Sequence, residues 1–369
     1  MTEWKKMTIG DLCDTISDTY HGDDEEVVLI NTSDVLEGKV LNHQVVENKK
    51  LKGQFKKTFK KNDILYSEIR PANKRYAFID FEDTENYIAS TKLMVLRPRE
   101  DVVRPRFLLS FLSSKSVLED LQQLAEMRSG TFPQITFSSE LAPIPIDVPD
   151  LETQDRIVRI LDVIEKKIST NMEINNNLEQ QAQTIYSSMF IEHRQESWST
   201  GQLSDLILVK YGKDHKKLAD GNYPVYGSGG IMRYVEKPLY TGESVLIPRK
   251  GTLNNVMYVN EAFWSVDTMF YTEMLRPNIA KFVYHFVKSK DLASLNAGSA
   301  VPSMTTNILN AMQLDIPDEK TLEKFENIVS PMYSAMQENT KESKILANTR
   351  DVLLSKLMSG ELDVSDIDL

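Results

Sequence analysis

Cysteine, metal-binding patterns and long apolar segments are scarce in this chain of 369 residues. The single cysteine, Cys13, cannot form a disulfide bond within the chain or a metal site of several thiolates. No apolar run approaches the roughly 20 residues that span a bilayer, and the first residues lack the apolar stretch of a secretory signal. The five histidines do not have the spacing of metal ligands. We therefore expect a cytoplasmic protein that needs no metal ion.

Signatures of catalysis are also missing. The sequence contains no Gly-x4-Gly-Lys-Ser/Thr loop for nucleotide phosphates, no Asn/Asp-Pro-Pro-aromatic motif for a target base and no Phe-x-Gly-x-Gly loop for S-adenosylmethionine. Nuclease-like strings begin at Pro149-Asp150 and Pro317-Asp318, but both fall in segments predicted to be helical, where the carboxylates face solvent. These absences predict a chain that is not an enzyme and uses no cofactor.

The net charge of −11 by itself argues against binding to nucleic acid, but the charge is unevenly distributed. Residues 1–147 carry 20 basic and 24 acidic side chains, and residues 198–317 carry 12 and 10. Residues 148–197 and 318–369 supply most of the net negative charge, whereas residues 48–76 hold ten basic side chains against two acidic ones. Because local fields decide binding to DNA, the acidic total does not exclude it.

The two halves of the chain repeat the same patterns in the same order. Trp4 and Trp198 each precede a short motif, Ile-Gly-Asp-Leu in the first half and Leu-Ser-Asp-Leu in the second. Each half continues with Leu-Arg-Pro, a Phe-x3-Phe-x2-Ser pattern and a loop that runs from a glycine through a proline to a threonine. From Pro149 and Pro317 onward the offset between the halves is a constant 168 residues. We interpret these matches as an internal duplication.

The segments that follow the two prolines are predicted to form long helices. Each opens with an acidic turn, at Asp150 and Asp318, which suits a helix N-terminus. Gly360 is the expected C-cap of the second helix. Within both segments, mostly apolar residues recur every seven positions, a pattern typical of a helix packed along a seam. The recurring positions are Ile157, Ile164, Asn171, Leu178 and Ile185 in the first segment and Phe325, Met332, Asn339, Leu346 and Leu353 in the second.

An asparagine interrupts each apolar seam at the same heptad position, at Asn171 and Asn339. A buried polar residue in such a seam costs stability but penalises slipped registers. The alternative interpretation is an exposed side chain near the middle of the helix.

We expect an α+β chain with two mixed α/β domains, at residues 1–147 and 198–317, separated by two long antiparallel, coiled-coil-like helices at residues 148–197 and 318–369. The internal duplication predicts a pseudo-twofold repeat. Within the domains, the apolar patterns predict strands at 63–66, 244–248 and 256–259 and helices at 105–126 and 278–293.

A basic stretch in the first domain is the first candidate for contact with DNA. Residues 49–75 interleave lysine and arginine with aromatic residues and end in a turn rich in side chains that can read bases. Lysine neutralises phosphates as a point charge, whereas arginine can also bind guanine through two hydrogen bonds. A lysine-rich run is equally often a solvated surface. The candidate contacts are Ser67, Arg70, Asn73, Lys74, Arg75, Lys92, Arg128 and Thr131.

Two glycine-containing loops are the candidates in the second domain, at Tyr226–Gly230 and Pro248–Asn255. Glycine lets the backbone approach a phosphate closely, while arginine, lysine, threonine and asparagine supply hydrogen-bond donors. Such a loop is about as often a simple turn. The candidate contacts are Gly229, Gly230, Arg233, Arg249, Lys250, Thr252, Asn254 and Ser299.

In the order of these motifs, the chain resembles the specificity subunit of type I restriction–modification enzymes over essentially its whole length. The second helix departs from the family pattern, because Thr321-Leu322-Glu323 stands where Leu-Glu-x-Gln is usual. The resemblance rests on the two tryptophan starts and on Tyr223–Ile231, Arg249–Thr252, Pro302–Thr305 and Ile144–Ile157.

The resemblance implies a sequence-specific DNA-binding subunit that is not itself catalytic and does not enter membranes. Each domain would read half of a bipartite site in double-stranded DNA. The helices would dock two DNA adenine methyltransferase (modification) subunits, and restriction/translocase subunits would join them. The alternative is a scaffold or adaptor that binds only protein, which salt-sensitive retention on heparin or DNA would distinguish. A fused methyltransferase–specificity enzyme is disfavoured by the missing catalytic motifs.

Overall fold

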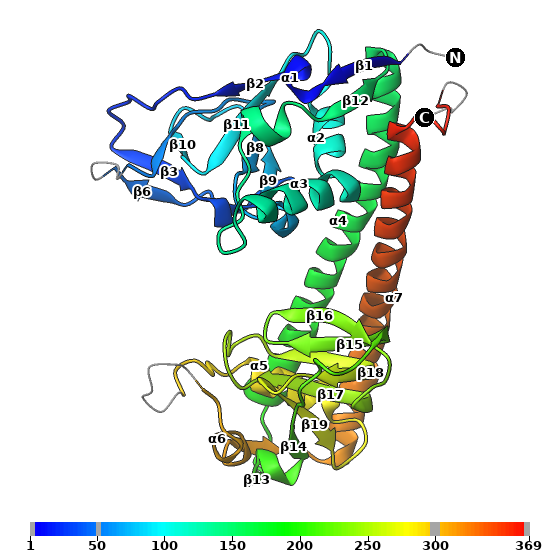
Figure 1. Cartoon of the computed structure of the whole chain (residues 1–369). Helices are drawn as coiled ribbons and strands as arrows, with labels where there is room; N and C mark the ends of the chain where they lie inside the picture. Colours follow the sequence, from blue (N-terminus) through cyan, green and yellow to red (C-terminus); the bar gives the residue numbers. More distant parts are fainter. Residues whose placement is uncertain (1–3, 49–52, 296–302, 365–369) are drawn as a thin grey trace. The chain divides into compact units, whose positions relative to one another are not determined.

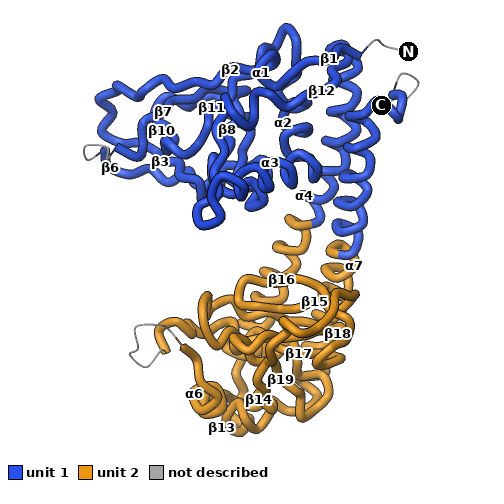
Figure 2. The backbone as a smooth tube through the Cα atoms, in the orientation of Figure 1, with its two compact units in different colours: residues 1–171, 341–369 blue, residues 172–340 orange. Residues whose placement is uncertain are grey.

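The computed structural model describes residues 4–48, 53–295 and 303–364. Two compact units make up the chain (Figure 2): residues 1–171 with 341–369, and residues 172–340.

Both long helices contribute to both units. Helix α4 (Leu151–Ser187) has 37 residues and continues into the π-helical turn η4 (Ser188–Glu192), and α7 (Glu319–Met358) has 40 residues. The boundary between the units falls inside each of these helices. Each unit therefore combines one predicted domain with part of each predicted helix.

The first unit is built from short strands and three helices that precede α4 (Figure 1). Its helices and helical turns are α1 (Ile9–Leu12), η1 (Thr32–Asp34), η2 (Pro71–Asn73), α2 (Pro105–Leu112), α3 (Lys115–Arg128) and η3 (Phe137–Leu141). Its strands are β1 (Lys5–Thr8), β2 (Cys13–Ile16), β3 (Glu26–Ile30), β4 (Val35–Leu36), β5 (Lys39–Val40), β6 (Val45–Glu47), β7 (Phe55–Lys57), β8 (Ile64–Ser67), β9 (Tyr76–Phe78), β10 (Tyr87–Ser90), β11 (Leu93–Pro98) and β12 (Pro145–Val148).

Two four-stranded sheets form the body of this unit, with strand orders β2-β11-β8-β9 and β6-β3-β10-β7. Strand β8 confirms the predicted strand at 63–66, and its four residues are all buried because neighbours cover both faces. One hydrophobic core joins this domain to the long helices, since Phe107 of α2, Ile157 of α4 and Leu357 of α7 belong to the same cluster.

The helix predicted over residues 105–126 is two helices, α2 and α3, so that prediction is wrong in its continuity. Ser114 has extended backbone angles (φ −61°, ψ 146°), and the Ser113 hydroxyl donates to the Ser110 carbonyl at 3.2 Å. Serine offers such local hydrogen bonds in competition with the helical ones. The break re-aims the chain so that Val117 and Leu121 of α3 are buried.

The second unit contains one six-stranded sheet in the order β14-β19-β17-β18-β15-β16. Its helices and helical turns, besides those of α4, η4 and α7, are η5 (Leu203–Asp205), α5 (Ala280–Lys288) and α6 (Thr306–Asn310). Its strands are β13 (Ser199–Gln202), β14 (Ile207–Tyr211), β15 (Asp220–Gly227), β16 (Gly230–Val235), β17 (Tyr240–Pro248), β18 (Met257–Ser265), β19 (Met269–Met274) and β20 (Gln313–Ile316).

The strands predicted at 244–248 and 256–259 lie in β17 and β18 and are confirmed. The helix predicted over 278–293 is shorter. Asn278 has a left-handed backbone (φ 59°), which prevents a helical start there, and α5 ends at Lys288.

The internal duplication has a structural counterpart in both units. Strand β1 pairs antiparallel with β12, and β13 pairs antiparallel with β20. The repeated aspartate of the opening motif has the same role in each copy: Asp11 accepts a hydrogen bond from the Thr8 amide and Asp205 from the Gln202 amide, both at 2.8 Å. The copies differ in their sheets, which are two of four strands in the first unit and one of six in the second.

Within each unit the two long helices run antiparallel, as predicted. In the first unit Lys167 pairs with Glu342 at 3.1 Å, and Glu165, earlier in α4, pairs with Arg350, later in α7. In the second unit the Phe190 and Phe325 rings lie 5.1 Å apart between centroids. All ten predicted seam positions are buried or half-buried.

The seam asparagines bond across the helix pair in an equivalent way. The Asn171 side chain is fully buried, and its Nδ2 donates to Glu342 Oε2 at 2.7 Å and to Ser343 Oγ at 3.3 Å. Asn339 Nδ2 donates to Asn175 Oδ1 at 2.9 Å. Positions 175 and 343 are related by the same 168-residue offset as 171 and 339. The exposed alternative is therefore wrong for Asn171.

The predicted helix ends are confirmed. Asp150 and Asp318 accept hydrogen bonds from the backbone amides of Thr153 and Thr321, at 2.8 and 2.9 Å. Gly360 follows α7 with a φ of 70°, a left-handed conformation that glycine adopts without a steric penalty.

A buried histidine joins α5 to both long helices in the second unit. His285 is fully buried; its Nδ1 lies 2.8 Å from Gln183 Oε1 and its Nε2 lies 2.9 Å from the Tyr333 hydroxyl. Because an amide oxygen only accepts, Nδ1 carries the proton and the hydroxyl donates to Nε2, which describes a neutral ring. Burial lowers the pKa of His285 from 6.5 to about 4.

This depressed pKa predicts a pH-dependent stability for the second unit. Between pH 6.5 and pH 4 the unfolded chain binds a proton at His285 that the folded chain does not, so stability is fully present above pH 6.5 and falls as the pH falls. We expect a loss of up to about 3 kcal/mol over this range. Urea unfolding at pH 7 and pH 5 measures it, and His285→Gln should flatten the dependence. An equally steep dependence in that variant would assign it to other groups.

Candidate functional site

The candidate turn of the first unit holds two residues in a strained backbone conformation. Arg70 and Lys74 flank η2 with φ values of 45° and 53°, a region that costs non-glycine residues about 1–3 kcal/mol. The exposed side chains of this turn include Arg70 and Asn73. Among the described residues, no hydrogen bond or ion pair engages the Arg70 guanidinium. Within the described part of the chain, the turn therefore presents an unpaired guanidinium on a constrained backbone.

A second loop pins this turn in place. Ile69 forms an isolated antiparallel bridge with Gln134, and the Arg70 amide donates to the Pro133 carbonyl at 3.2 Å. Lys92 joins the two segments, since its Nζ lies 3.3 Å from Glu68 Oε2 and 3.1 Å from Gln134 Oε1. The structure thus brings Arg70, Lys92 and the loop that contains Thr131 together.

Other candidates of this domain are engaged within the fold. Arg75 Nη1 donates to the carbonyls of Ser33 and Val35, at 3.0 and 3.3 Å. Lys74 pairs with Glu37 at 2.8 Å, and Arg128 pairs with Glu140 at 2.9 Å. Ser67 is buried and bonds to the backbone of Ile69. These side chains hold the turn and the loop in shape.

The basic stretch at 49–75 is divided in space. Lys57 Nζ donates to the Leu93 carbonyl at 2.8 Å. Lys60 and Lys61 line a cavity of about 810 Å³ away from the Arg70 turn, together with acidic residues that include Glu82. Lys61 forms an ion pair with Glu82. Lys49, Lys50 and Lys52 lie outside the described residues. Ten basic residues in sequence therefore do not gather on one surface among the described residues.

The two glycine loops of the second unit meet. Gly230 (φ 111°) begins β16 after a tight turn, and Gly251 (φ 85°) lies where an added Cβ would be 2.7 Å from the Ser228 hydroxyl. Asn255 Nδ2 donates to the Ser228 carbonyl at 2.8 Å. Gly229 is exposed and open to solvent. Only glycine permits this backbone conformation and this approach at Gly251.

Arg249 and Lys250 are pinned to a further loop in the same way as Arg70. Lys250 forms an isolated antiparallel bridge with Ser303, and the Arg249 carbonyl accepts from the Met304 amide at 2.9 Å. The Arg249 guanidinium lies over the Tyr211 ring, 5.4 Å from its centroid, and Nη1 donates to the Asp267 carbonyl at 3.2 Å. The Lys250 side chain is exposed, as is that of Thr252.

Two more candidates of this unit have structural partners, and one is not described. Arg233 pairs with Asp220 at 2.8 Å. Asn254 donates to Asp291 at 3.0 Å and accepts from the Ala293 amide at 3.0 Å. Ser299 lies outside the described residues.

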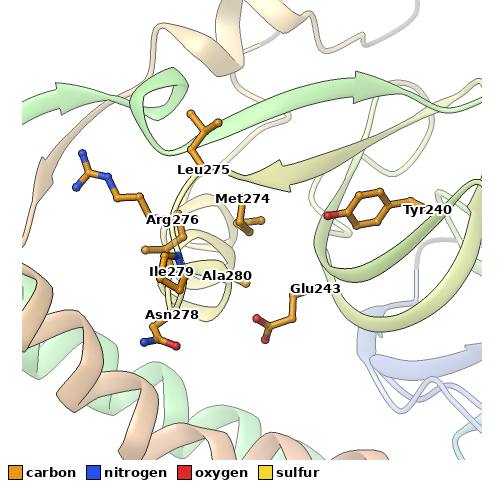
Figure 3. A pocket seen from close by; sticks show the side chains of 9 residues that line it. Tyr240, Glu243, Met274, Leu275, Arg276, Asn278, Ile279 and Ala280 are labelled. Carbon is orange, nitrogen blue, oxygen red and sulfur yellow. The ribbon is translucent and has the colours of Figure 1, made fainter.

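A pocket of about 400 Å³ lies elsewhere in the second unit, between β17 and the segment that leads into α5 (Figure 3). Tyr240 and Glu243 line one side, and Leu275, Arg276 and Asn278 lie across from them. None of the residues predicted from the sequence as DNA contacts line it.

The sequence pattern missed Phe132, Tyr211 and the partners of the pinned loops. Phe132 is 49% exposed and stands in the loop pinned to Arg70, and Tyr211 supports Arg249. The repeated Gly…Pro…Thr loop was the available signal, but its pairing with the basic turn is a tertiary contact. No helix in the described part of the chain is long and apolar enough to cross a membrane.

Residues 1–180 and 195–346 match the family described as the type I restriction modification DNA specificity domain, and the chain belongs to this family. The resemblance found in the sequence is thereby confirmed.

Two curated relatives and one crystal structure illustrate the similarity. Over 193 residues the chain is 45% identical to the type I restriction enzyme HindI specificity subunit of Haemophilus influenzae, which covers 52% of this chain and 42% of that protein. Over 313 residues it is 20% identical to the MjaIX specificity subunit of Methanocaldococcus jannaschii, covering 73% and 72%. The S subunit of a type I restriction–modification system from M. genitalium has a similar fold, with a TM-score of 0.55 at 19% identity over 97% and 96% of the chains.

Proposed function

We propose that this chain is the specificity subunit of a type I restriction–modification complex and that it selects a DNA sequence without catalysing a reaction. The observation that carries the proposal is the repeated loop arrangement. In each unit a basic turn, at Arg70 or at Arg249-Lys250, is pinned by an isolated bridge to a loop that contains a proline. A duplicated device of this kind suits the reading of two half-sites.

Each pinned turn offers donors that suit DNA. Arg70 and Lys250 have exposed cationic groups, and Asn73 and Thr252 add neutral hydrogen-bonding groups. Arginine and asparagine can each bind a base edge in the major groove through two hydrogen bonds, while lysine neutralises phosphates. We infer that the first unit reads one half of a bipartite double-stranded site and the second unit the other half.

The long helices are proposed to dock two DNA adenine methyltransferase subunits, which restriction and translocase subunits then join. Exposed apolar side chains on α4 and α7 support this assignment. Within the first unit Val163 is 65% exposed, Ile345 is 64% exposed and Val352 is 58% exposed. Large apolar side chains on the outer face of a helix are typical of a surface that another subunit covers.

Methylation mapping tests the proposal directly. Cells that express this chain with its methyltransferase partner should acquire adenine methylation at one bipartite sequence, and cells that lack the chain should not. The purified chain alone should neither methylate nor cleave DNA. The absence of salt-sensitive binding to DNA, together with an unchanged methylome, would favour the protein-binding adaptor. Turnover by the pure chain, lost on a point mutation within it, would contradict the absence of catalysis.

A further inference from the structure

Phe132 is an exposed aromatic side chain within the pinned loop of the first unit. Its exposed fraction is 49%, although the loop around it is polar and the neighbouring Pro133 is buried. Two more exposed apolar side chains, Leu124 (40%) and Met127 (84%), lie one helical turn apart near the end of α3, just before this loop. Of these three side chains, Phe132 is the one that stands in the loop bridged to the Arg70 turn, where an aromatic ring can contact a ligand that the turn also binds.

The backbone contacts of the loop fix where Phe132 stands. Its amide donates to the Ser129 hydroxyl at 3.1 Å, and the following proline restricts Phe132 to extended backbone conformations. The Pro133 carbonyl accepts a hydrogen bond from the Arg70 amide at 3.2 Å. Phe132, the residue before Pro133, therefore lies close to the turn that carries the Arg70 guanidinium. On the α3 side, Gln122 Oε1 accepts from the Ala72 amide at 3.1 Å. Helix, turn and loop are thus tied together around Arg70.

The second half of the sequence has an apolar residue at the same place. Val301 precedes Pro302, and Ser303 after it forms the bridge with Lys250, just as Gln134 after Pro133 forms the bridge with Ile69. Val301 itself lies outside the described residues. The sequence repeat therefore places an apolar residue before the proline in both halves.

We propose that Phe132 reads a thymine of the first half-site by packing its ring against the C5-methyl group in the major groove. This thymine would lie beside the base edge that Arg70 contacts. This inference rests on the proposed DNA-binding function. Thymine is the base that presents a methyl group in the major groove, and phenylalanine is one of the side chains that contacts it. Hydrogen-bonding groups such as Arg70 and Asn73 cannot recognise that methyl group, so an apolar side chain adds information that they lack.

Deoxyuridine substitution tests the contact, because it removes only the methyl group. Once the methylated site is mapped, each thymine of the site is replaced in turn by deoxyuridine, and the affinity of the assembled methyltransferase complex is measured for each duplex. We expect one position to weaken binding by about fourfold, which is the value of one buried methyl group (about 0.8 kcal/mol, at 1.4 kcal/mol per tenfold). Phe132→Ala should bind the unmodified site more weakly and should be insensitive to deoxyuridine at that position.

Met127→Ala is the matched control, since Met127 is apolar and more exposed, and it should keep the wild-type response to deoxyuridine. Equal sensitivity to deoxyuridine in wild-type and Phe132→Ala complexes would overturn the inference, as would a wild-type complex whose affinity is unchanged by deoxyuridine at every thymine of the site. If Phe132→Ala instead reduces assembly with the methyltransferase at unchanged DNA affinity, the ring is a protein contact and the inference is wrong. Failure of the wild-type complex to bind its mapped site would count against the proposed function itself.

Discussion

Replacing Lys281 by methionine is expected to destabilise the second unit by up to about 3–5 kcal/mol, because it removes the buried cation that two partly buried carboxylates share. Lys281 is 4% exposed, and its Nζ lies 2.9 Å from Glu243 Oε1 and 2.5 Å from Glu326 Oε1. The rings of Tyr258 and Tyr333 face the same ammonium group, 5.2 and 5.7 Å from their centroids. Without Lys281 the two carboxylates would lose the cation between them, and Glu326, whose side chain is 14% exposed, would be screened only weakly by water.

Urea unfolding followed by tryptophan fluorescence measures this loss, since Trp198 and Trp264 both lie in the second unit. Adding Glu326→Gln to the lysine variant should recover part of the stability, because the amide oxygen can still accept from the Ser330 hydroxyl that now bonds Glu326 at 2.6 Å. If the double variant were no more stable than the single one, charge repulsion would not be the cause.

Arg106 provides a matched control in the first unit. It precedes Phe107 as Lys281 precedes Phe282 in the repeated pattern, and it pairs with Asp162 of α4 at 3.4 Å. Both side chains of that pair are about half exposed, at 47% and 49%. Water screens such a pair, so Arg106→Met should cost no more than about 1 kcal/mol.

Arg249→Ala is expected to weaken binding of the assembled complex to DNA by about 1–3 kcal/mol, or roughly 5- to 150-fold, if the guanidinium reads a base. The Tyr211 ring and the Asp267 carbonyl hold this guanidinium in one orientation, and the bridge between Lys250 and Ser303 holds its backbone. A side chain fixed before binding loses less entropy when it binds, which favours a large effect.

Affinity for the mapped site and for sites altered in either half separates the two modes of contact. A base contact should relax the sequence requirement in one half-site only. We expect Lys250 to contact a phosphate. Lys250→Ala should then weaken binding to all sequences alike and reduce the slope of log affinity against log salt concentration by about one unit. Arg276→Ala is the control, because Arg276 is an exposed arginine of the same unit that lines the pocket in Figure 3. Unchanged affinity in both loop variants would remove this loop from the DNA-binding site.

Much of the architecture could be predicted from local patterns. The heptad period places Ile157 and Phe325 in a seam, and the aspartates at 150 and 318 start the helices, because these effects act over one or a few helical turns. The duplication was also visible, since Asp11 and Asp205 cap the same local turn in each copy. The break at Ser113-Ser114 was missed because serine only weakly disfavours a helix, so the two serines did not interrupt the apolar helical pattern around them.

The candidate site depended on contacts between distant residues, which only the tertiary structure decided. Arg70 and Arg75 are alike in the sequence, yet the Arg70 guanidinium has no partner among the described residues. Arg75 and Lys57 donate to carbonyls more than 30 residues away. Lys281 looked like an ordinary helical lysine, but β17 and α7 supply the carboxylates that bury it. By itself the sequence determined the two long helices, the repeat and the family, because these follow from local periodicity and order. The burial and pairing of each charge were decided by the tertiary structure, since desolvation and ion pairing depend on neighbours that the chain brings together only when it folds.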